Sequence, residues 1–253
     1  MLRLKPWLAG AGLLALAFCC AQQRLPLVGV GGSSGPSNKL VFIQACSTLL
    51  VVAGNSTTLN IGSTGPCGAA VNPTAGDFVM VYFDSGTSNP TGLAASDGLG
   101  NSWTCATQNA KGGWCYSVLA TGGADTVTLS TEFGTEGPRI SLEFRGQNST
   151  PIDVAAAFNT ISSSTSYSMP GVTTGNANDV VIGCAGQLNG NYSFTAGSPF
   201  AIPTDGTIVG TGSQLMSGMC EYDIVTSTGT YTPTATISTA TAGQGFSVAL
   251  KSS

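Results

Sequence analysis

The sequence predicts an all-β sandwich of two antiparallel sheets, held together by disulfides. Only 8% of the 253 residues are charged, whereas glycine occurs 35 times. The residues that build solvated helix faces are therefore scarce, and those that form tight turns are common. From Lys39 onward, short apolar runs alternate with clusters of Gly, Asn, Ser and Pro, as in sandwiches and barrels.

Residues 1–21 are expected to be a signal peptide. Arg3 and Lys5 form its basic start, and the apolar stretch of residues 8–18 follows. This stretch is too short to cross a hydrocarbon layer of about 30 Å as a helix. Cleavage after Ala21 is expected, and an uncleaved anchor is the alternative.

The end of this segment also resembles a lipoprotein signal. Leu16-Ala17-Phe18-Cys19 is similar to the lipobox of bacterial lipoproteins, so Cys19 or Cys20 is a candidate for a lipid anchor to a membrane. Phe18 stands where that motif has a small residue. The protein is therefore expected to be secreted or displayed at the cell surface.

Two parts are expected after the signal peptide. Residues 22–38 are rich in Gly, Ser and Pro and predict a flexible linker, and residues 39–253 form the β-sandwich domain. Two separate small domains are the alternative, disfavoured because each half has too few residues for a core of its own. Without residues 1–21 the chain keeps six basic and twelve acidic side chains, so a nucleic acid is not an expected partner.

The expected strands are short and closely spaced. They are residues 39–46, 48–53, 77–84, 101–107, 113–120, 124–131, 138–145, 164–169, 178–186, 214–226, 230–237 and 243–250. A helical turn or two is expected at residues 151–160, and no long stretch carries the 3.6-residue apolar period of a helix.

A faint internal repeat relates the two halves of the domain. Residues 77–82 match 179–184, residues 115–121 match 220–226, and residues 137–144 match 243–250. Two copies of a four-strand unit indicate two sheets closed over one core.

The repeat also orients side chains. In the second copy Cys220 lies on one face of its strand, and Glu221 and Asp223 lie on the other. Because two carboxylates do not face an apolar core unpaired, the cysteine face is expected to point inward. Carried to the first copy, the same argument turns Trp114 and Tyr116 toward solvent.

Six cysteines follow the signal peptide, which indicates disulfides in an exported chain. They allow 15 pairings, of which local spacing favours Cys46–Cys67, Cys105–Cys115 and Cys184–Cys220. Metal binding is the rival interpretation, but the chain has no histidine and this part has no Cys-x-x-Cys pair.

Several motifs resemble jelly-roll modules of secreted and surface proteins of environmental bacteria. They are Gly-Asp-Phe-Val-Met-Val at 76–81, Asp-Gly-Leu-Gly-Asn-Ser-Trp at 97–103, Trp-Cys-Tyr at 114–116, and the segments 123–129, 149–153 and 245–250. The resemblance implies a jelly-roll-like sandwich over roughly residues 75–250. Such modules are similar to carbohydrate-binding or adhesive domains, so the resemblance bears on the fold more than on activity.

The chemistry available to the chain is narrow. Without histidine, a Ser-His-Asp or Cys-His site and His-ligated zinc are excluded, and no phosphate-binding loop is present; no metal or cofactor is expected. Asp97 and Asn101 offer too few oxygens for calcium, so a plain turn is expected there. Glycosidases need only two acids about 5–10 Å apart. Residues 221–225 resemble part of the acid-rich strand of jelly-roll glucanases, but Thr226 stands in the region of that family's second Glu.

The leading expectation is a non-catalytic binding module, most suited to a polysaccharide or surface glycan. A sugar ring packs its C–H groups on aromatic faces, so Trp114 and Tyr116 are the candidate stacking residues, with Glu221 and Asp223 as hydrogen-bonding partners. One alternative is a structural subunit that self-associates through an uncovered strand edge at residues 39–53. The other is a glycoside hydrolase that uses carboxylates.

Overall fold

The computed structural model describes residues 39–50, 54–65, 67, 71–84, 92–108, 111–133 and 137–253, all within one unit, Pro36–Ser253. The expected signal peptide, the linker and the candidate lipid sites Cys19 and Cys20 lie outside the described residues. Strands dominate, and the described helical structure is one 3-10 turn, η1 (Gly62–Thr64). No helix in this part of the chain has the length and apolar character needed to cross a membrane.

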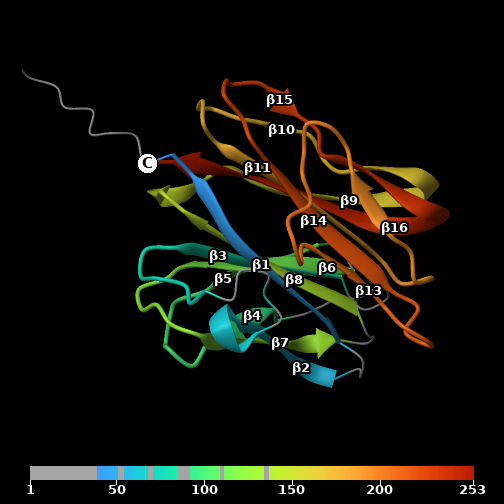
Figure 1. Ribbon diagram of the computed structural model, residues 1–253, viewed down its shortest axis with the longest axis horizontal. Coiled ribbons are helices and arrows are strands. Elements are labelled where there is room, and N and C mark those ends of the chain that lie inside the picture. The colour runs from blue at the N-terminus through green and yellow to red at the C-terminus, as the bar shows by residue number, and fades with distance from the viewer. Residues whose placement is uncertain are drawn as a thin grey trace, which may run out of the picture. The chain divides into compact units, whose positions relative to one another are not determined.

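The strands stack in three layers (Figure 1). The middle layer is a five-stranded antiparallel sheet in the order β1 (Val41–Leu50), β8 (Gly137–Arg145), β3 (Phe78–Asp84), β6 (Gly112–Val118) and β5 (Thr104–Gln108). On one side lies a six-stranded sheet in the order β12 (Phe194–Ala196), β16 (Thr234–Ser252), β11 (Val180–Gln187), β14 (Ser217–Ile224) and β13 (Thr207–Val209), with β9 (Gln147–Ser168) also paired to β16.

The remaining strands complete the outer layers. A three-stranded sheet in the order β2 (Gly54–Ile61), β7 (Asp125–Phe133) and β4 (Ala94–Ser96) lies on the other side of the middle sheet. A small ribbon is formed by β10 (Val172–Thr173) and β15 (Thr230–Tyr231). The predicted all-β antiparallel sandwich is confirmed, but it has more than the two expected sheets.

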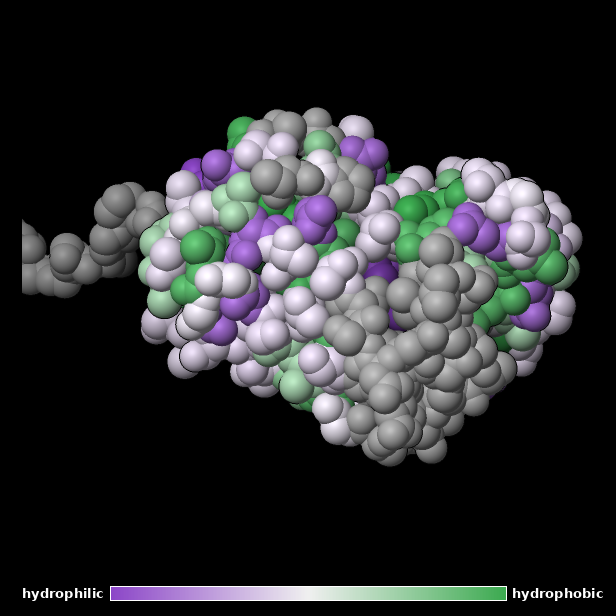
Figure 2. All heavy atoms as spheres, turned by 90° about the horizontal axis from the view of Figure 1, so that it is seen from below, coloured by the Kyte–Doolittle hydropathy of each residue, from purple (hydrophilic) through white to green (hydrophobic). Residues whose placement is uncertain are grey.

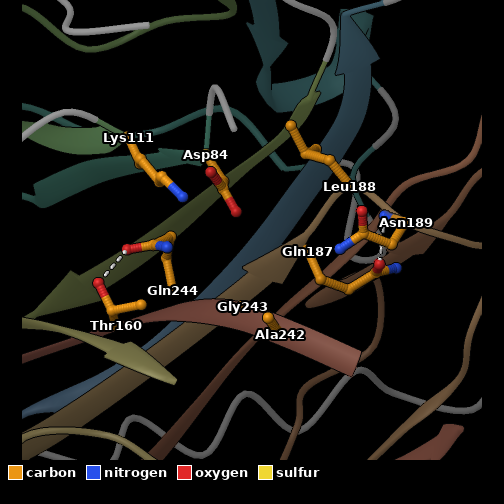
Figure 3. A pocket seen from close by; sticks show the side chains of 9 residues that line it. All are labelled: Asp84, Lys111, Thr160, Gln187, Leu188, Asn189, Ala242, Gly243 and Gln244. Carbon is orange, nitrogen blue, oxygen red and sulfur yellow. Dashed lines mark hydrogen bonds between the residues drawn. The ribbon is translucent and has the colours of Figure 1, made fainter. Parts of the chain in front are cut away.

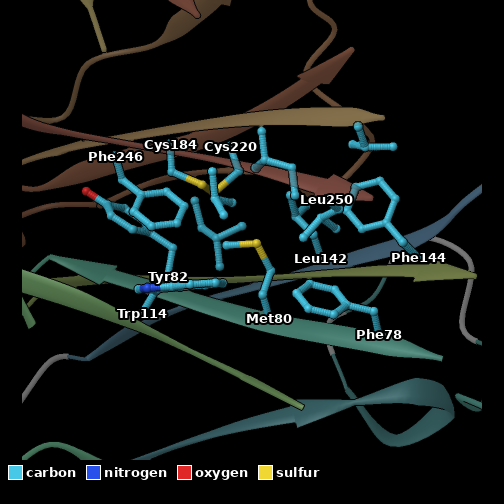
Figure 4. Close-up of a cluster of buried hydrophobic side chains, with 14 of the residues drawn as sticks. Phe78, Met80, Tyr82, Trp114, Leu142, Phe144, Cys184, Cys220, Phe246 and Leu250 are labelled. Atoms are coloured by element: carbon cyan, nitrogen blue, oxygen red, sulfur yellow. A yellow bond between two sulfur atoms is a disulfide. The ribbon is translucent and has the colours of Figure 1, made fainter. Parts of the chain in front are cut away.

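Several strands are covered on both faces. Every residue of β3 and β11 is buried, and so is every residue of β8 before Arg145. One apolar cluster fills the space between the five- and six-stranded sheets (Figure 4), and a second lies between the five- and three-stranded sheets. The expectation that one row of each strand faces water is therefore wrong for these strands, because both of their faces are covered.

The helical turn expected at residues 151–160 is also wrong. These residues lie in β9, which pairs with β16 along most of its length. The short alanine-containing run there favours a helix locally, but pairing with a long neighbouring strand satisfies the backbone and overrides that preference. The strand β2 was not expected, and residues 51–53 of the predicted strand 48–53 lie outside the described residues.

The strands of the predicted repeat take corresponding places. In the middle sheet β3 lies between β8 and β6, and in the six-stranded sheet β11 lies between β16 and β14. The jelly-roll topology and the duplication themselves stay predictions. The strand pairing shows that the matched segments 115–121 and 220–226 are one residue out of register. Tyr82 pairs with Trp114, and Cys184, which matches Tyr82 in the predicted repeat, pairs with Cys220. Trp114, and not Cys115, is therefore the counterpart of Cys220 in the pairing.

The three disulfides join the cysteines in the predicted pairs: Cys46–Cys67, Cys105–Cys115 and Cys184–Cys220. The last two link residues directly opposite each other on neighbouring antiparallel strands. Cys184–Cys220 belongs to the cluster between the five- and six-stranded sheets, whereas the other two bridges belong to the cluster on the far side of the middle sheet.

The surface reflects the composition of the chain. Figure 2 shows mostly pale residues of intermediate hydropathy on the face in view, with strongly hydrophilic residues in small groups. Because only 8% of the residues are charged, a site with several charged or amide side chains stands out in this molecule.

Candidate functional site

Trp114 and Tyr116, the expected sugar-stacking residues, belong to the interior. Trp114 is 3% exposed, and its ring lies 4.8 Å from that of Tyr116 and 5.3 Å from that of Phe246. Tyr116 is half-buried against the same cluster. The predicted outward orientation is wrong because the face of β6 that carries Trp114 and Tyr116 packs against the apolar cluster between the five- and six-stranded sheets.

Glu221 and Asp223 are not the solvated pair that was expected. Glu221 is fully buried, whereas Asp223 is half-buried. Burial raises the pKa of Glu221 to about 8, although backbone N–H groups of Gly197 and Thr234 oppose the shift. Glu221 therefore enters the interior as a neutral acid, and it lies on the opposite face of β14 from Cys220. The structure does not bring these four predicted residues together into one site.

The turn at residues 97–101 is held by its own side chains. Asp97 accepts hydrogen bonds from the backbone N–H of Asn101 and from the indole N–H of Trp103, each at 2.9 Å. Burial raises the pKa of Asp97, but the hydrogen bonds from Trp103 and Asn101 outweigh it and hold the pKa below its ordinary value. The carboxylate is thus committed to the fold, and no metal-binding group of three or more His, Cys, Asp or Glu occurs among the described residues.

A polar cleft of about 210 Å³ opens at one end of the contact between the five- and six-stranded sheets. Figure 3 shows side chains from both sheets around it. The lining residues are Asp84, Lys111, Thr160, Gln187, Leu188, Asn189, Ala242, Gly243 and Gln244. One carboxylate, one ammonium group, three carboxamides and one hydroxyl are thus gathered in a molecule where only 8% of residues are charged.

The cleft forms where two apolar rows end. On β3 the inward row Phe78, Met80 and Tyr82 continues two residues later as Asp84, at the last position of the strand. On β16 the row that contains Phe246 is preceded by Gln244. Both polar side chains line the cleft, although Asp84 is only 1% and Gln244 only 6% exposed.

Close packing places Asp84 against the opposite sheet. A Cβ atom at Gly186 would lie 2.7 Å from Oδ2 of Asp84. Any larger residue at position 186 would collide with this carboxylate, because real Cβ atoms do not approach so closely. Glycine at this position therefore allows β11 to approach the end of β3.

The carboxamides are held by hydrogen bonds in fixed orientations. The side-chain nitrogen of Gln187 donates to the hydroxyl of Ser217, and its oxygen accepts the backbone N–H of Asn189 at 2.6 Å. The side-chain nitrogen of Asn189 donates to the hydroxyl of Thr241 at 3.2 Å, and Thr160 donates to the carboxamide oxygen of Gln244 at 3.4 Å (Figure 3). A preorganised set of polar groups binds ligands at less entropic cost.

A buried ionic group stands behind the cleft. Arg139 is fully buried, and its Nη1 donates to the backbone oxygen of Asp84 at 2.9 Å. Burial lowers the pKa of Arg139 to about 9, while the charge of Asp84 and the hydroxyl of Tyr82 oppose this change. Burial and the charge of Asp84 raise the pKa of Tyr82 well above its ordinary value. The guanidinium lies over the ring of Phe83, 5.2 Å from its centroid, on the face of the middle sheet that is turned away from the cleft.

Two buried hydrogen-bond donors lie in the apolar cluster on the side of Asp84. The hydroxyl of Tyr82 and the indole N–H of Trp114 are buried and have no hydrogen-bond partner within the described part of the chain. Figure 4 shows both polar atoms on the side of the cluster away from Phe78 and Phe144, which is the side of Asp84 because β3 begins at Phe78 and ends at Asp84. A buried donor without a partner calls for an acceptor from water or ligand.

A second hollow of about 290 Å³ lies beside the edge strand β1, lined by Phe42, Ile43, Gln44, Ala45, Pro203, Thr204 and Tyr222. The rings of Phe42 and Tyr222 stack at 4.8 Å, so one face of each is already covered. The side-chain nitrogen of Gln44 is engaged with Glu143 at 2.6 Å. This hollow offers fewer polar groups than the cleft.

Sequence reasoning found none of the residues that line the cleft. They come from five separate strands or strand ends, and the one local signal is a polar residue that closes an apolar run, as Asp84 and Gln187 do. The fold and the cleft together define a disulfide-bonded, all-β sandwich protein with a polar cleft between its sheets. No protein-family model, curated protein or solved structure matches this chain.

Proposed function

We propose that this protein is a non-catalytic binding module that acts outside the cytoplasm and holds a carbohydrate in the polar cleft. The observation that carries the proposal is the pair of oriented carboxamides Asn189 and Gln244, which lines the cleft beside Asp84. Gln187 is buried and hydrogen-bonded in the wall of the same cleft. Sugar hydroxyls both donate and accept hydrogen bonds, and carboxamides offer both kinds of partner from one planar group. The candidate site thereby moves from the aromatic pair Trp114 and Tyr116 to these side chains.

The size of the cleft limits the part of the ligand that enters. Sites for drug-sized ligands measure about 300–1,000 Å³, and this cleft measures about 210 Å³. A single sugar ring suits it better than a stretch of polysaccharide, so a chain end or a side branch is the part expected to bind. The unpartnered donors of Tyr82 and Trp114 would favour acceptor atoms at the inner end.

The disulfides support the proposed location. Three bridges hold the domain, and such bonds persist in oxidising compartments. Together with the expected signal peptide, they favour secretion or display at the cell surface. A polysaccharide or surface glycan is available there as a partner.

Hydrolysis is the weaker interpretation of the same cleft. Asp84 is the single carboxyl group among the described residues that line it, whereas glycosidases act with a pair. Glu221 does not line the cleft and is buried elsewhere on β14. A binding site therefore explains the lining residues without requiring a second carboxyl group.

Self-association through β1 is weaker as well. This strand is an edge of the five-stranded sheet, but its register shifts between Phe42 and Gln44, and Cys46 is bridged to Cys67. A bulge and a covered stretch both hinder pairing with another chain.

A glycan array followed by titration calorimetry tests the proposal. Asn189→Ala and Gln244→Ala are each expected to weaken saccharide binding about two- to tenfold, the effect of one neutral hydrogen bond. Thr204→Ala, in the second hollow, is the matched control and should leave affinity unchanged. Equal binding by all four proteins would remove the cleft as the site, and no binding to any glycan would refute the module.

A further inference from the structure

The charged side chains that line the cleft balance each other. Among the described residues of the lining, Lys111 is the cation and Asp84 is the anion. Asp84 is only 1% exposed, so its carboxylate belongs to the packing between the sheets. The lining therefore gives no preference for a charged ligand, and selection among sugars has to come from its neutral groups.

Two neighbouring residues of different character stand out among those neutral groups. Leu188 and Asn189 follow directly after β11, and both line the cleft. Leu188 is half-buried and Asn189 is exposed. In Figure 3 both side chains lie on the opposite side of the cleft from Lys111 and Thr160. An apolar surface thus lies next to a carboxamide within the cleft.

The carboxamide of Asn189 is oriented, and its oxygen is available to a ligand. The side-chain nitrogen donates to the hydroxyl of Thr241 at 3.2 Å, and the backbone N–H of Asn189 donates to the side-chain oxygen of Gln187 at 2.6 Å. The carboxamide oxygen takes part in neither hydrogen bond. It can therefore accept an N–H or O–H group from a ligand that lies against Leu188.

We infer that the cleft selects an N-acetylated amino sugar, whose acetamido N–H donates to the carboxamide oxygen of Asn189 while its methyl group packs on Leu188. This inference rests on the proposed function and specifies its ligand class. An acetamido group joins a planar amide to a methyl group, so it matches a carboxamide with an apolar neighbour. A hydroxyl group in the same place can also donate to Asn189, but it leaves Leu188 in contact with water and gains no apolar burial.

The test compares two matched pairs of methyl glycosides, each titrated against the full chain. One pair is N-acetylglucosamine and glucose, and the other is N-acetylgalactosamine and galactose. Within each pair only the group at carbon 2 differs, an acetamido group or a hydroxyl. In at least one pair the acetamido member is expected to bind at least about threefold more tightly, the effect of burying one methyl group. Protein NMR measures the weak affinities expected of single rings.

Variants of Leu188 assign the preference to the cleft. Leu188→Asn puts a polar group of similar shape in place of the apolar one, so it should abolish the preference and leave the hydroxyl member bound as before. Leu188→Met keeps an apolar surface and should retain the preference. Leu99→Asn makes the same change at an exposed residue that does not line the cleft, and this control should change nothing. Thermal unfolding of each variant verifies that it is folded.

The outcomes separate the two proposals. If the members of both pairs bind equally, if the hydroxyl members bind more tightly, or if Leu188→Asn keeps the preference, the inference is wrong and the carbohydrate module stands. If no saccharide binds, in these titrations or on the glycan array, the proposed function falls and the inference falls with it.

Discussion

Glu221→Gln should make the protein more stable, and the gain should grow with pH. Glu221 is fully buried on β14, and burial raises its pKa from 4.5 to about 8. An acid whose pKa is higher in the folded state binds more protons there than in the unfolded chain, so stability falls as pH rises from about 4.5 to about 8. Glutamine has nearly the same shape and does not ionise, so the variant escapes this loss.

The size of the effect follows from the two pKa values. The coupling between proton binding and folding predicts that ionisation of Glu221 lowers the free energy of unfolding by less than about 1 kcal/mol at pH 5 and by at most about 4 kcal/mol at pH 8. Urea unfolding of wild type and variant at pH 5, 6.5 and 8, with the disulfides intact, measures the difference. Glu143 and Asp179, whose pKa values burial also raises, are present in both proteins and cancel.

Asp223→Asn serves as the control for Glu221→Gln. It makes the same chemical change two residues along β14, at a half-buried position, and is expected to show no comparable gain between pH 5 and pH 8. A gain for Glu221→Gln that is equal at the two pH values, or no gain at all, would refute the assignment of Glu221 as a buried neutral acid.

Three further changes test the interior. Asp77→Asn removes the buried negative charge, and one of the two oxygens, that accept the Arg145 hydrogen bonds at 2.7 and 2.8 Å. Burial raises the pKa of Asp77, but these and other hydrogen bonds lower it to about 2. This substitution should lower the free energy of unfolding by about 2 kcal/mol at pH 7, and the loss should shrink as the pH falls from 4 to 2. Urea unfolding measures the loss, and a loss that does not change with pH contradicts the prediction. Replacing Cys184 and Cys220 by alanine opens a loop that spans 36 residues and should cost about 4 kcal/mol, seen as a lower Tm; an unchanged Tm argues against the bridge. Trp114→Ala should cost about 3–5 kcal/mol, whereas wild-type stability would place the indole at the surface.

The features predictable from the sequence were the local ones. Cys105 and Cys115 are ten residues apart, within the reach of one hairpin, and this pair could be proposed without knowledge of the rest of the fold. The apolar run of β3 likewise stands out as a strand because turn residues bound it. Such features depend on neighbouring residues alone.

The orientation of side chains was not predictable in this way. Alternation along a strand separates Trp114 from Cys115, but it does not tell how many layers cover the strand. Because the middle sheet is covered on both faces, Trp114 and Cys115 are both buried. Glu221, on β14 of the six-stranded sheet, is buried as well. The number of layers is set by contacts between distant segments, which one strand's sequence does not encode.

The candidate site escaped prediction for a related reason. Asp84, Lys111 and Gln244 are distant in sequence and meet only because the end of β3, the start of β6 and the middle of β16 lie near one another. None of them belongs to a spacing motif. A site assembled from several separate strands becomes visible once the sheets are stacked.

The position of a bound saccharide, determined in a crystal structure of the complex, tests the central claim most directly. The account predicts a sugar ring between the ends of β3 and β11, in contact with Asn189 and Gln244. A saccharide bound only in the hollow of Phe42 and Tyr222 would contradict it.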